Sequence, residues 1–169
     1  MTTASRFVIG ESDGWLVSHR ANSALPGYLI VASKGLANDL FDLPDGALRE
    51  IGPLLALSQA TLKRELGAPR VYIGRYGHIP GLPFHFHVIP IYDWVEKLFW
   101  RDGRYRILGQ LAEGEGETGT DGAELTLFVW REFCERRRAP PIEGPSVSET
   151  IALLRETMGY RLRAIERSR

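Results

Sequence analysis

The sequence predicts an α+β domain with an antiparallel sheet of about five strands, one long crossing helix and a mostly helical C-terminal extension. Short apolar segments joined by turn-rich connections come before any helix, which is typical of an antiparallel meander. One long amphipathic segment follows, and two more strand-like segments come after it. We expect residues 1–92 to form the sheet core, and residues 93–169 to be an extension packed on this core within a single domain.

Three strands are expected near the N-terminus. Residues 7–9 are apolar, residues 11–14 have turn chemistry, and residues 15–17 are typical of the return strand of a hairpin. A polar connection at residues 20–26 leads to a third strand at residues 27–33. Connections this short favour antiparallel pairing of consecutive strands.

A long helix is expected to begin near Pro44 and to end at Gly67. Proline suits the first turn of a helix, and glycine suits the left-handed conformation that closes one. Between them, apolar residues recur at spacings of three, four or seven residues and form one stripe. The stripe consists of Leu48, Ile51, Leu55, Leu62 and Leu66. A fourth strand is expected at residues 70–76.

Residues 83–92 are predicted to form the fifth strand, because they are mostly aromatic or β-branched and follow a turn-rich segment. Side chains alternate between the two faces of a strand. One face consists of Phe84, Phe86 and Val88, and the other consists of His85, His87, Ile89 and Ile91. The apolar face is expected to pack on a helix, while the other face presents two imidazoles about 7 Å apart along the strand.

The first part of the extension, residues 93–122, differs in composition from the sheet core. The aromatic run at residues 93–100 is expected to cover an edge of the core or to contact a partner subunit. A short helix is expected at residues 104–111, followed by an acidic, glycine-rich surface loop at residues 113–122 that has little to bury.

The second part of the extension is predicted to contain two helices. Residues 124–135 favour a helix, with a strand at residues 125–129 as the alternative. The inward-facing residues of that helix would be Leu125, Phe128, Val129 and Phe133. A capping box at residues 146–149 opens a last helix that is expected to end near Met158.

The composition limits the function. The chain has 169 residues, of which 44% are hydrophobic, which suits the core of one globular domain. Its formal net charge is zero, so we expect neither nucleic acid nor a membrane as a partner. The single Cys134 excludes an internal disulfide framework and a cysteine-rich zinc site. Because the sequence shows no apolar signal segment and no run of membrane-spanning length, we expect a soluble cytoplasmic protein.

The pair of His85 and His87 has three interpretations. Both side chains could be half-buried structural histidines, which is also the expected role of the isolated His19 and His78. A His-x-His strand also places two metal ligands on one face, but His78 or an acidic residue would have to supply a third ligand. The remaining interpretation is nucleophilic catalysis, which a resemblance to a known family supports.

The segment Pro-Phe-His-Phe-His-Val-Ile-Pro at residues 83–90 resembles the signature of the histidine-triad (HIT) family. In that signature, histidines alternate with apolar residues on a strand that usually ends in proline. The Pro-Gly-Tyr-Leu-Ile-Val segment at residues 26–31 resembles the third strand of the family, and the long helix and a strand ending near Gly77 follow in the family's order. The resemblance covers roughly residues 6–92 and implies a HIT-like fold.

The resemblance implies hydrolysis or transfer at the α-phosphate of a nucleotide, of the phosphoramidase or dinucleoside polyphosphate hydrolase type. The Val-Ile-Pro after His87 favours the register Pro83, His85, His87. In this register His85 is the nucleophile that forms a nucleotidyl-histidine, and His87 is the partner that donates to the phosphate oxygens.

The resemblance also bears on cofactors and partners. No cofactor is required and no metal site is implied, with a divalent cation possible alongside a polyphosphate substrate. The substrate would be a nucleotide or nucleotide conjugate, and we expect a homodimer. Two alternatives stay open: a HIT-like nucleotide-binding module with little or no catalysis, and a metal-binding enzyme that uses His85 and His87.

The sequence departs from the family pattern at several places. Pro83 stands in the first position of the triad, and the Gly-Gln-Ser/Thr phosphate loop is absent. Tyr28 stands where a histidine often follows Pro-Gly, and Arg75 stands where an asparagine is often found. Arg20 and Arg75 are candidate phosphate clamps because a guanidinium offers forked donors, and Tyr28 is a candidate substrate contact.

Overall fold

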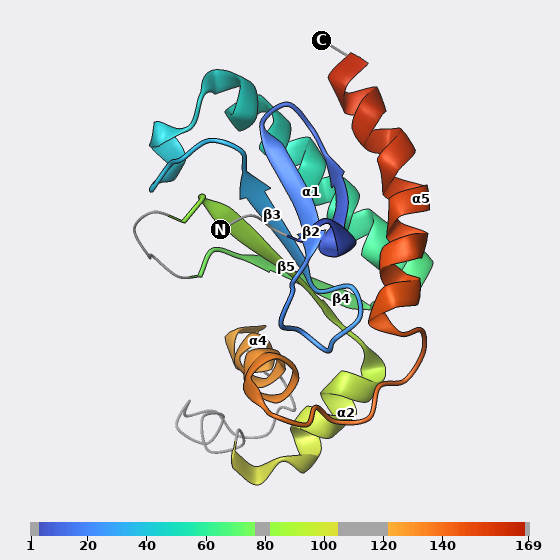
Figure 1. The fold of residues 1–169 in the computed structure, drawn as a ribbon. Helices are drawn as coiled ribbons and strands as arrows, with labels where there is room; N and C mark the ends of the chain where they lie inside the picture. Colours follow the sequence, from blue (N-terminus) through green and yellow to red (C-terminus); the bar gives the residue numbers. More distant parts are fainter. Residues whose placement is uncertain (1–3, 77–81, 105–121, 168–169) are drawn as a thin grey trace.

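The fold is built on one five-stranded antiparallel sheet with the strand order β1-β2-β3-β5-β4. The structure is a computed structural model that describes residues 4–76, 82–104 and 122–167. The strands are β1 (Val8–Glu11), β2 (Trp15–His19), β3 (Leu29–Ser33), β4 (Arg70–Gly74) and β5 (His85–Ile91). The predicted α+β class, the meander of the first three strands and the two later strands are confirmed (Figure 1).

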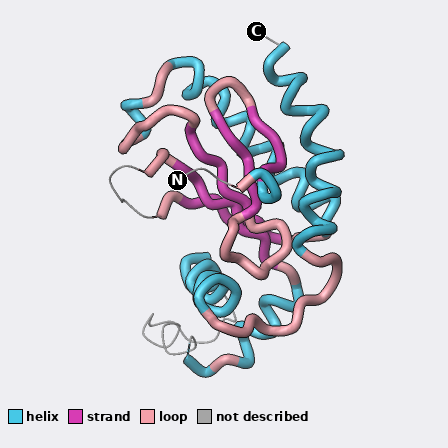
Figure 2. Tube along the Cα trace, viewed as in Figure 1, coloured by secondary structure: helices cyan, strands magenta, loops and turns pink. Residues whose placement is uncertain are grey.

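Helices cover the sheet on both sides. The α-helices are α1 (Asp45–Leu66), α2 (Asp93–Arg101), α4 (Gly122–Trp130) and α5 (Val147–Arg167), and the short turns are η1 (Ser5–Phe7), η2 (Leu40–Asp42) and the π-helical η3 (Arg131–Glu135). Figure 2 shows the strands in the middle of the molecule, with α1 and α5 to one side and α2 and α4 below. None of the helices in the described part of the chain is long and apolar enough to cross a membrane.

Helix α1 packs on the face of the sheet that carries Trp15. It begins after Pro44 and ends at Gly67, whose φ of 65° is the left-handed conformation predicted from the sequence. The indole Nε1 of Trp15 donates a hydrogen bond to the carbonyl oxygen of Ala47, at 2.9 Å. Phe84 also lies on this face, because its ring centroid is 6.3 Å from that of Trp15.

Helix α5 covers the β1 end of the same face and packs on both β1 and α1. The capping box is present, since the backbone N–H of Ser146 donates to the Glu149 carboxylate at 2.8 Å. The helix does not end near Met158 as predicted but continues to Arg167, and Leu162 in the added part is buried. Leu162 is 1% exposed and lies against Gly10, where an added Cβ atom would overlap the leucine side chain.

Helix α4 lies across the opposite face of the sheet, where its residues line a cavity together with His85 and His87. Residues 124–135 are helical rather than extended, as α4 followed without a break by η3. The four residues predicted to face inward, Leu125, Phe128, Val129 and Phe133, are all buried. The predicted helix at 104–111 and loop at 113–122 fall almost wholly outside the described residues.

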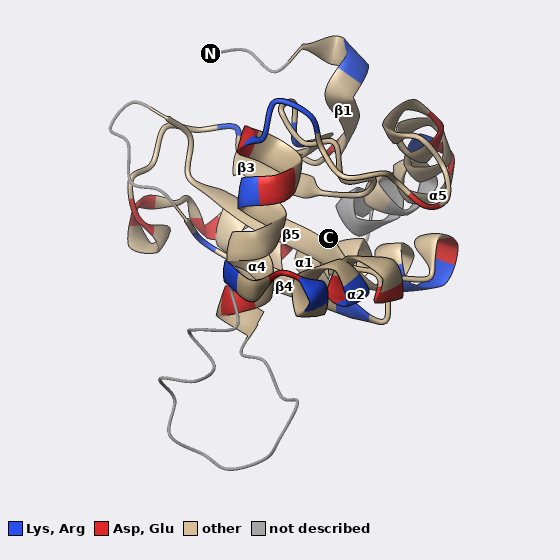
Figure 3. Cartoon of the chain, turned by 90° about the horizontal axis from the view of Figure 1, so that it is seen from below, with Lys and Arg blue, Asp and Glu red and all other residues tan. Residues whose placement is uncertain are grey.

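Helix α2 follows β5 directly and supports α4. Its aromatic sequence buries Val95 and Phe99, and the ring of Phe99 meets that of Phe128 edge-on at 5.6 Å. Figure 3 shows α2 and α4 as neighbours under the sheet, so the aromatic run covers part of the chain's own core.

Candidate active site

Strand β5 brings the two histidines to the face that α4 covers. It lies inside the sheet, where His87 pairs with Ile30 of β3 and with Gly74 of β4. Phe86 faces Trp15 on the α1 side, and alternation then turns the histidines to the other side. The two imidazole centroids are 5.0 Å apart.

The half-buried His85 uses one ring nitrogen in a hydrogen bond within the described part of the chain. Its Nδ1 atom lies 2.9 Å from the carbonyl oxygen of Pro83. A carbonyl oxygen only accepts hydrogen bonds, so Nδ1 carries the proton in the neutral ring and Nε2 carries the lone pair. No residue in the described ranges forms a hydrogen bond with Nε2, and the side chain lines a cavity.

His87 makes several hydrogen bonds and is only 6% exposed. Its Nδ1 atom lies 3.0 Å from the Tyr28 hydroxyl and 3.5 Å from Nη1 of Arg20, which can only donate. The ring also makes a hydrogen bond with the backbone of Tyr76. Burial, with smaller contributions from the charge of Arg20 and from His85, lowers the pKa of His87 to about 3.

Tyr28 links Arg20 to His87. Nη1 of Arg20 donates to the Tyr28 hydroxyl at 2.8 Å, which leaves the hydroxyl proton to be donated to Nδ1 of His87. The side chain of Tyr28 is buried, and burial raises its pKa to about 12 despite the opposing charge of Arg20. The tyrosine therefore stays protonated as a hydrogen-bond donor.

Arg20 brings a positive charge to the edge of the cavity. Its Nε atom donates to the side-chain oxygen of Asn22 at 2.9 Å, and its guanidinium lies over the Tyr28 ring at 5.0 Å. Among the residues that the structure describes, no carboxylate forms an ion pair with it. A half-buried guanidinium without a carboxylate partner is suited to bind a phosphate.

Arg75 does not join this group, although the sequence suggested it as a second clamp. Its guanidinium lies over the Phe84 ring at 4.6 Å and forms an ion pair with Asp39 at 3.6 Å. The reason is alternation: Gly74 pairs with His87, so the next side chain turns to the opposite face of the sheet.

The cavity between β5 and α4 has a volume of about 570 Å³. It is lined by Arg20, Tyr28, Tyr76, Leu82, His85, His87, Ile89, Ala123, Thr126, Leu127 and Trp130. The Tyr76 hydroxyl lies 3.2 Å from Oγ1 of Thr126, which connects the end of β4 to α4. Of the predicted site residues, Arg20, Tyr28, His85 and His87 therefore share one cavity.

Sequence reasoning missed the contribution of α4 to this cavity. Ala123, Leu127 and Trp130 recur at spacings of four and three residues, which places them on one face of the helix. This second apolar stripe could have indicated that α4 lines a cavity. The larger stripe that packs into the core made it difficult to recognise in the sequence.

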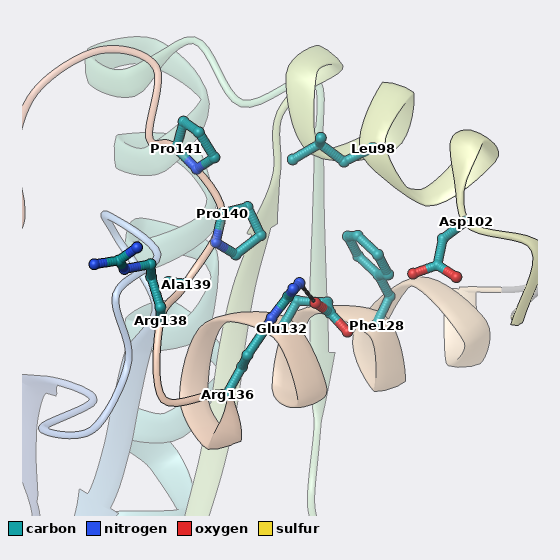
Figure 4. A pocket seen from close by; sticks show the side chains of 9 residues that line it. All are labelled: Leu98, Asp102, Phe128, Glu132, Arg136, Arg138, Ala139, Pro140 and Pro141. Carbon is teal, nitrogen blue, oxygen red and sulfur yellow. Dashed lines mark hydrogen bonds and ion pairs between the residues drawn. The ribbon is translucent and has the colours of Figure 1, made fainter.

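A second cavity, of about 380 Å³, lies away from the histidines between α2 and η3 (Figure 4). Its one buried carboxylate, Glu132, is bound by Nη2 of Arg104 at 2.7 Å and by Nη1 of Arg136 at 2.5 Å. Figure 4 shows Leu98 of α2 and Phe128 of α4 beside this ion-pair cluster. The cluster therefore joins the end of α2 to the helix that covers the histidines.

The described residues do not supply the set of ligands that the metal-binding interpretation requires. The described residues contain no group of three or more His, Cys, Asp or Glu side chains placed to hold a metal ion. His78, the third ligand that the sequence suggested, lies outside the described residues. His19 is buried, with Nε2 3.0 Å from the carbonyl oxygen of Leu25, as a structural histidine would be.

No protein-family model matches the sequence, and no curated protein matches it either. Among solved structures, the chain is similar to the C. elegans NitFhit protein, with a TM-score of 0.54 and 12% identity over 94% of this chain and 29% of the nematode protein. It is also similar to a Bartonella henselae HIT-like protein involved in cell-cycle regulation (TM-score 0.51, 12% identity, 89% of this chain and 85% of that one). A uridylyltransferase matches with a TM-score of 0.53 and 16% identity, over 95% of this chain and 42% of its own.

These similarities establish the fold. The chain spans less than a third of the nematode protein and under half of the uridylyltransferase. In both comparisons, however, nearly all of this chain is covered. The chain therefore has a HIT-like fold, as the resemblance in its histidine strand predicted.

Proposed function

We propose that this protein is a nucleotide hydrolase or nucleotidyl transferase that acts at an α-phosphate through a nucleotidyl-histidine on His85. The observation that carries the proposal is the hydrogen bond from Nδ1 of His85 to the Pro83 carbonyl, which leaves the lone pair of Nε2 free at a cavity. Arg20, which has no carboxylate partner among the described residues, lines the same cavity. The HIT-like fold supports this assignment.

The reaction proceeds in two steps. Nε2 of His85 attacks the α-phosphorus, the bond from phosphorus to the leaving group breaks, and the leaving group takes the electron pair and a proton from solvent. Water then attacks the same phosphorus, the bond to Nε2 breaks, and the surplus proton returns to solvent. The products are a nucleoside monophosphate and the released group, or a transferred nucleotide where another acceptor replaces water.

The surrounding residues prepare the nucleophile and bind charge. The backbone carbonyl of Pro83 holds the ring of His85 by a hydrogen bond. Because this contact uses no side chain of residue 83, it does not need a histidine in the first triad position. The guanidinium of Arg20 stabilises the phosphate oxygens in the transition state. His87 stays neutral, and its role is to hold the chain of hydrogen bonds from Arg20 through Tyr28 rather than to protonate the substrate.

Further properties follow from this proposal. The histidine mechanism needs no cofactor, and a divalent cation would enter only with a polyphosphate substrate. The substrate is a nucleotide or nucleotide conjugate, and a homodimer is the expected assembly.

A nucleotide-binding module with little or no catalysis is the second candidate. It is favoured by Pro83, which has no backbone N–H, and by Leu82, which lines the cavity without a polar group. A phosphate loop would offer hydrogen-bond donors at this point, and their loss weakens transition-state binding.

The two candidates are separated by rapid quench at neutral pH with adenosine 5′-phosphoramidate labelled on phosphorus. Wild-type protein is expected to accumulate covalent label and to release labelled monophosphate, and His85→Ala is expected to lose both. Tight binding of AMP without label or turnover would instead select the binding module. Metal analysis of tag-free protein accompanies the assay, and activity that requires a bound transition metal would contradict the histidine mechanism.

A further inference from the structure

Helix α4 carries two apolar faces, and only one of them is used for folding. Leu125, Phe128 and Val129 are buried against the core, but Leu127 remains 39% exposed. Leu127 belongs to the stripe with Ala123 and Trp130 that lines the histidine cavity. A surface helix normally turns polar residues away from its core face, so this second stripe is suited to contact a ligand.

The direction of attack brings the leaving group toward this stripe. His85 lies on the face of β5 opposite to Phe86 and lines the cavity, and residues of α4 line it as well. Figure 1 shows the ribbon of α4 beside this part of the sheet. In phosphoryl transfer the attacking and leaving atoms lie roughly in line through the phosphorus. When Nε2 attacks from the sheet side, the breaking bond therefore points away from the sheet, toward α4.

The chemistry of the walls indicates what kind of group is bound there. The indole of Trp130 and the ring of Tyr76 line the cavity together with Leu127, and they offer aromatic surface for an offset-stacked or edge-on ring contact. The hydroxyl of Thr126 already donates to the carbonyl oxygen of Ala123 and meets the Tyr76 hydroxyl. No Asp or Glu is found among the described residues that line the cavity, so a group rich in hydroxyl or ammonium donors would lose its hydrogen bonds on binding.

The wall is fixed rather than loosely attached. Phe128 on the buried side of α4 meets Phe99 of α2 edge-on, and Glu132 one turn later is bound by two arginines. A helix held in this way presents Leu127 and Trp130 at a set distance from the sheet, as a specificity pocket requires.

We propose that the stripe Ala123, Leu127 and Trp130 binds the leaving group of the substrate, and that this group is flat, aromatic and poor in hydrogen-bonding atoms. The substrate class is then a nucleoside phosphoramidate or phosphate ester of an amine or alcohol that carries an aromatic ring. This inference rests on the proposed function at His85 and specifies which substrates it serves.

The test compares kcat/KM for three adenosine 5′-phosphoramidates that carry 2-phenylethylamine, 2-cyclohexylethylamine or ethylamine. The three amines have similar basicity, so the chemical step is matched and binding decides the order. We expect kcat/KM for the phenylethyl substrate to be about tenfold or more above that for the ethyl substrate. We also expect it to be about threefold above that for the cyclohexylethyl substrate. Leu127→Asp and Trp130→Ala should collapse these ratios toward one, while Arg131→Ala, an exposed residue just beyond the stripe, should preserve them.

Equal kcat/KM values for the three substrates with wild-type protein would overturn the inference and leave the nucleotidyl-histidine mechanism standing. A matching titration measures binding of the same substrates to His85→Ala. A binding preference for the phenylethyl compound that Leu127→Asp removes, with no turnover by wild type, would keep the leaving-group site and contradict the catalytic proposal. Absence of both turnover and binding preference would overturn both.

Discussion

Residue 84 and strand β5 carry alternating side chains on two faces, yet these two faces are filled in different ways. On the α1 side, Phe84 and Phe86 pack against each other and against Trp15, with ring centroids 5.3 to 6.3 Å apart. On the α4 side, His85 and His87 border a cavity of about 570 Å³. Both sides are covered by a helix, but only the α1 side is closed by packing.

The difference between the two faces indicates that residues on the α1 side mainly stabilise the fold, whereas residues on the α4 side form the candidate site. Polar groups on the α4 side are joined into a hydrogen-bonded chain under an apolar helix, and this chain borders a cavity instead of a closely packed core. The same arrangement leaves one imidazole nitrogen and one guanidinium available at the cavity. Substitutions on the α1 side should therefore change mainly the stability, while substitutions on the α4 side should also change binding or catalysis.

The largest expected effect on stability comes from the packed face. Phe84→Ala should lower the free energy of unfolding by about 3–5 kcal/mol, because Phe84 is only 4% exposed and its removal leaves a cavity. Urea denaturation measures this loss, and Ile73→Ala, at a residue 38% exposed, is the control that should cost less than about 1 kcal/mol. A loss of less than about 1 kcal/mol for Phe84→Ala would mean that this face is not the packed one.

The next effect concerns the pH dependence of stability. The pKa of His87 is about 3 in the folded protein and about 6.5 when unfolded, so the unfolded state binds more protons between these values. Stability should therefore fall as the pH drops from about 6.5 toward 3, by up to a few kcal/mol from this group. Unfolding of His87→Gln over the same range should show a flatter curve than wild type, since His19 and the carboxylates remain in both proteins. Parallel curves would contradict the buried, neutral state of His87.

The two arginines provide a matched test of the cavity face. Arg20→Ala should weaken AMP binding by about 10- to 100-fold, because a charged hydrogen bond is worth about 1.5–3 kcal/mol. Arg75→Ala should leave binding within about twofold, since Arg75 lies over Phe84 on the other face. Isothermal titration measures both, and equal weakening by the two variants would contradict the assignment of Arg20 alone to the phosphate.

The smallest expected effect separates two buried tyrosines. Tyr28→Phe and Tyr92→Phe should each cost about 1–2 kcal/mol of stability, because each hydroxyl makes a buried hydrogen bond, Tyr92 to the carbonyl oxygen of Pro26 at 2.8 Å. Only Tyr28→Phe should also lower kcat/KM, by about tenfold, because it removes the hydroxyl group that hydrogen-bonds to both Arg20 and His87. Equal kcat/KM for the two variants would reduce Tyr28 to a structural role.

Much of the fold could be predicted from the sequence because it is encoded locally. The alternation in β5 separates its phenylalanines from its histidines, and the stripe between Pro44 and Gly67 defines α1. The end of α5 was predicted too early, because Leu162 is held by a contact with Gly10 that lies far away in the sequence.

The candidate site was predictable only where its residues share one strand. His85 and His87 follow from the β5 pattern, but whether Arg20 or Arg75 reaches them depends on how β2 and β4 end. The wall formed by Leu127 and Trp130 depends on α4 crossing the sheet, and no local pattern specifies that placement. These long-range contacts decide which residues meet at the cavity.

The most direct test of the central claim is to locate the covalent label. Wild-type protein is quenched at neutral pH with an adenosine phosphoramidate, digested without acid, and its peptides are sequenced by mass spectrometry. The account predicts an adenylyl group on the imidazole of His85 and on no other residue. An adenylyl group on His87 or elsewhere, or no adduct during active turnover, would contradict it.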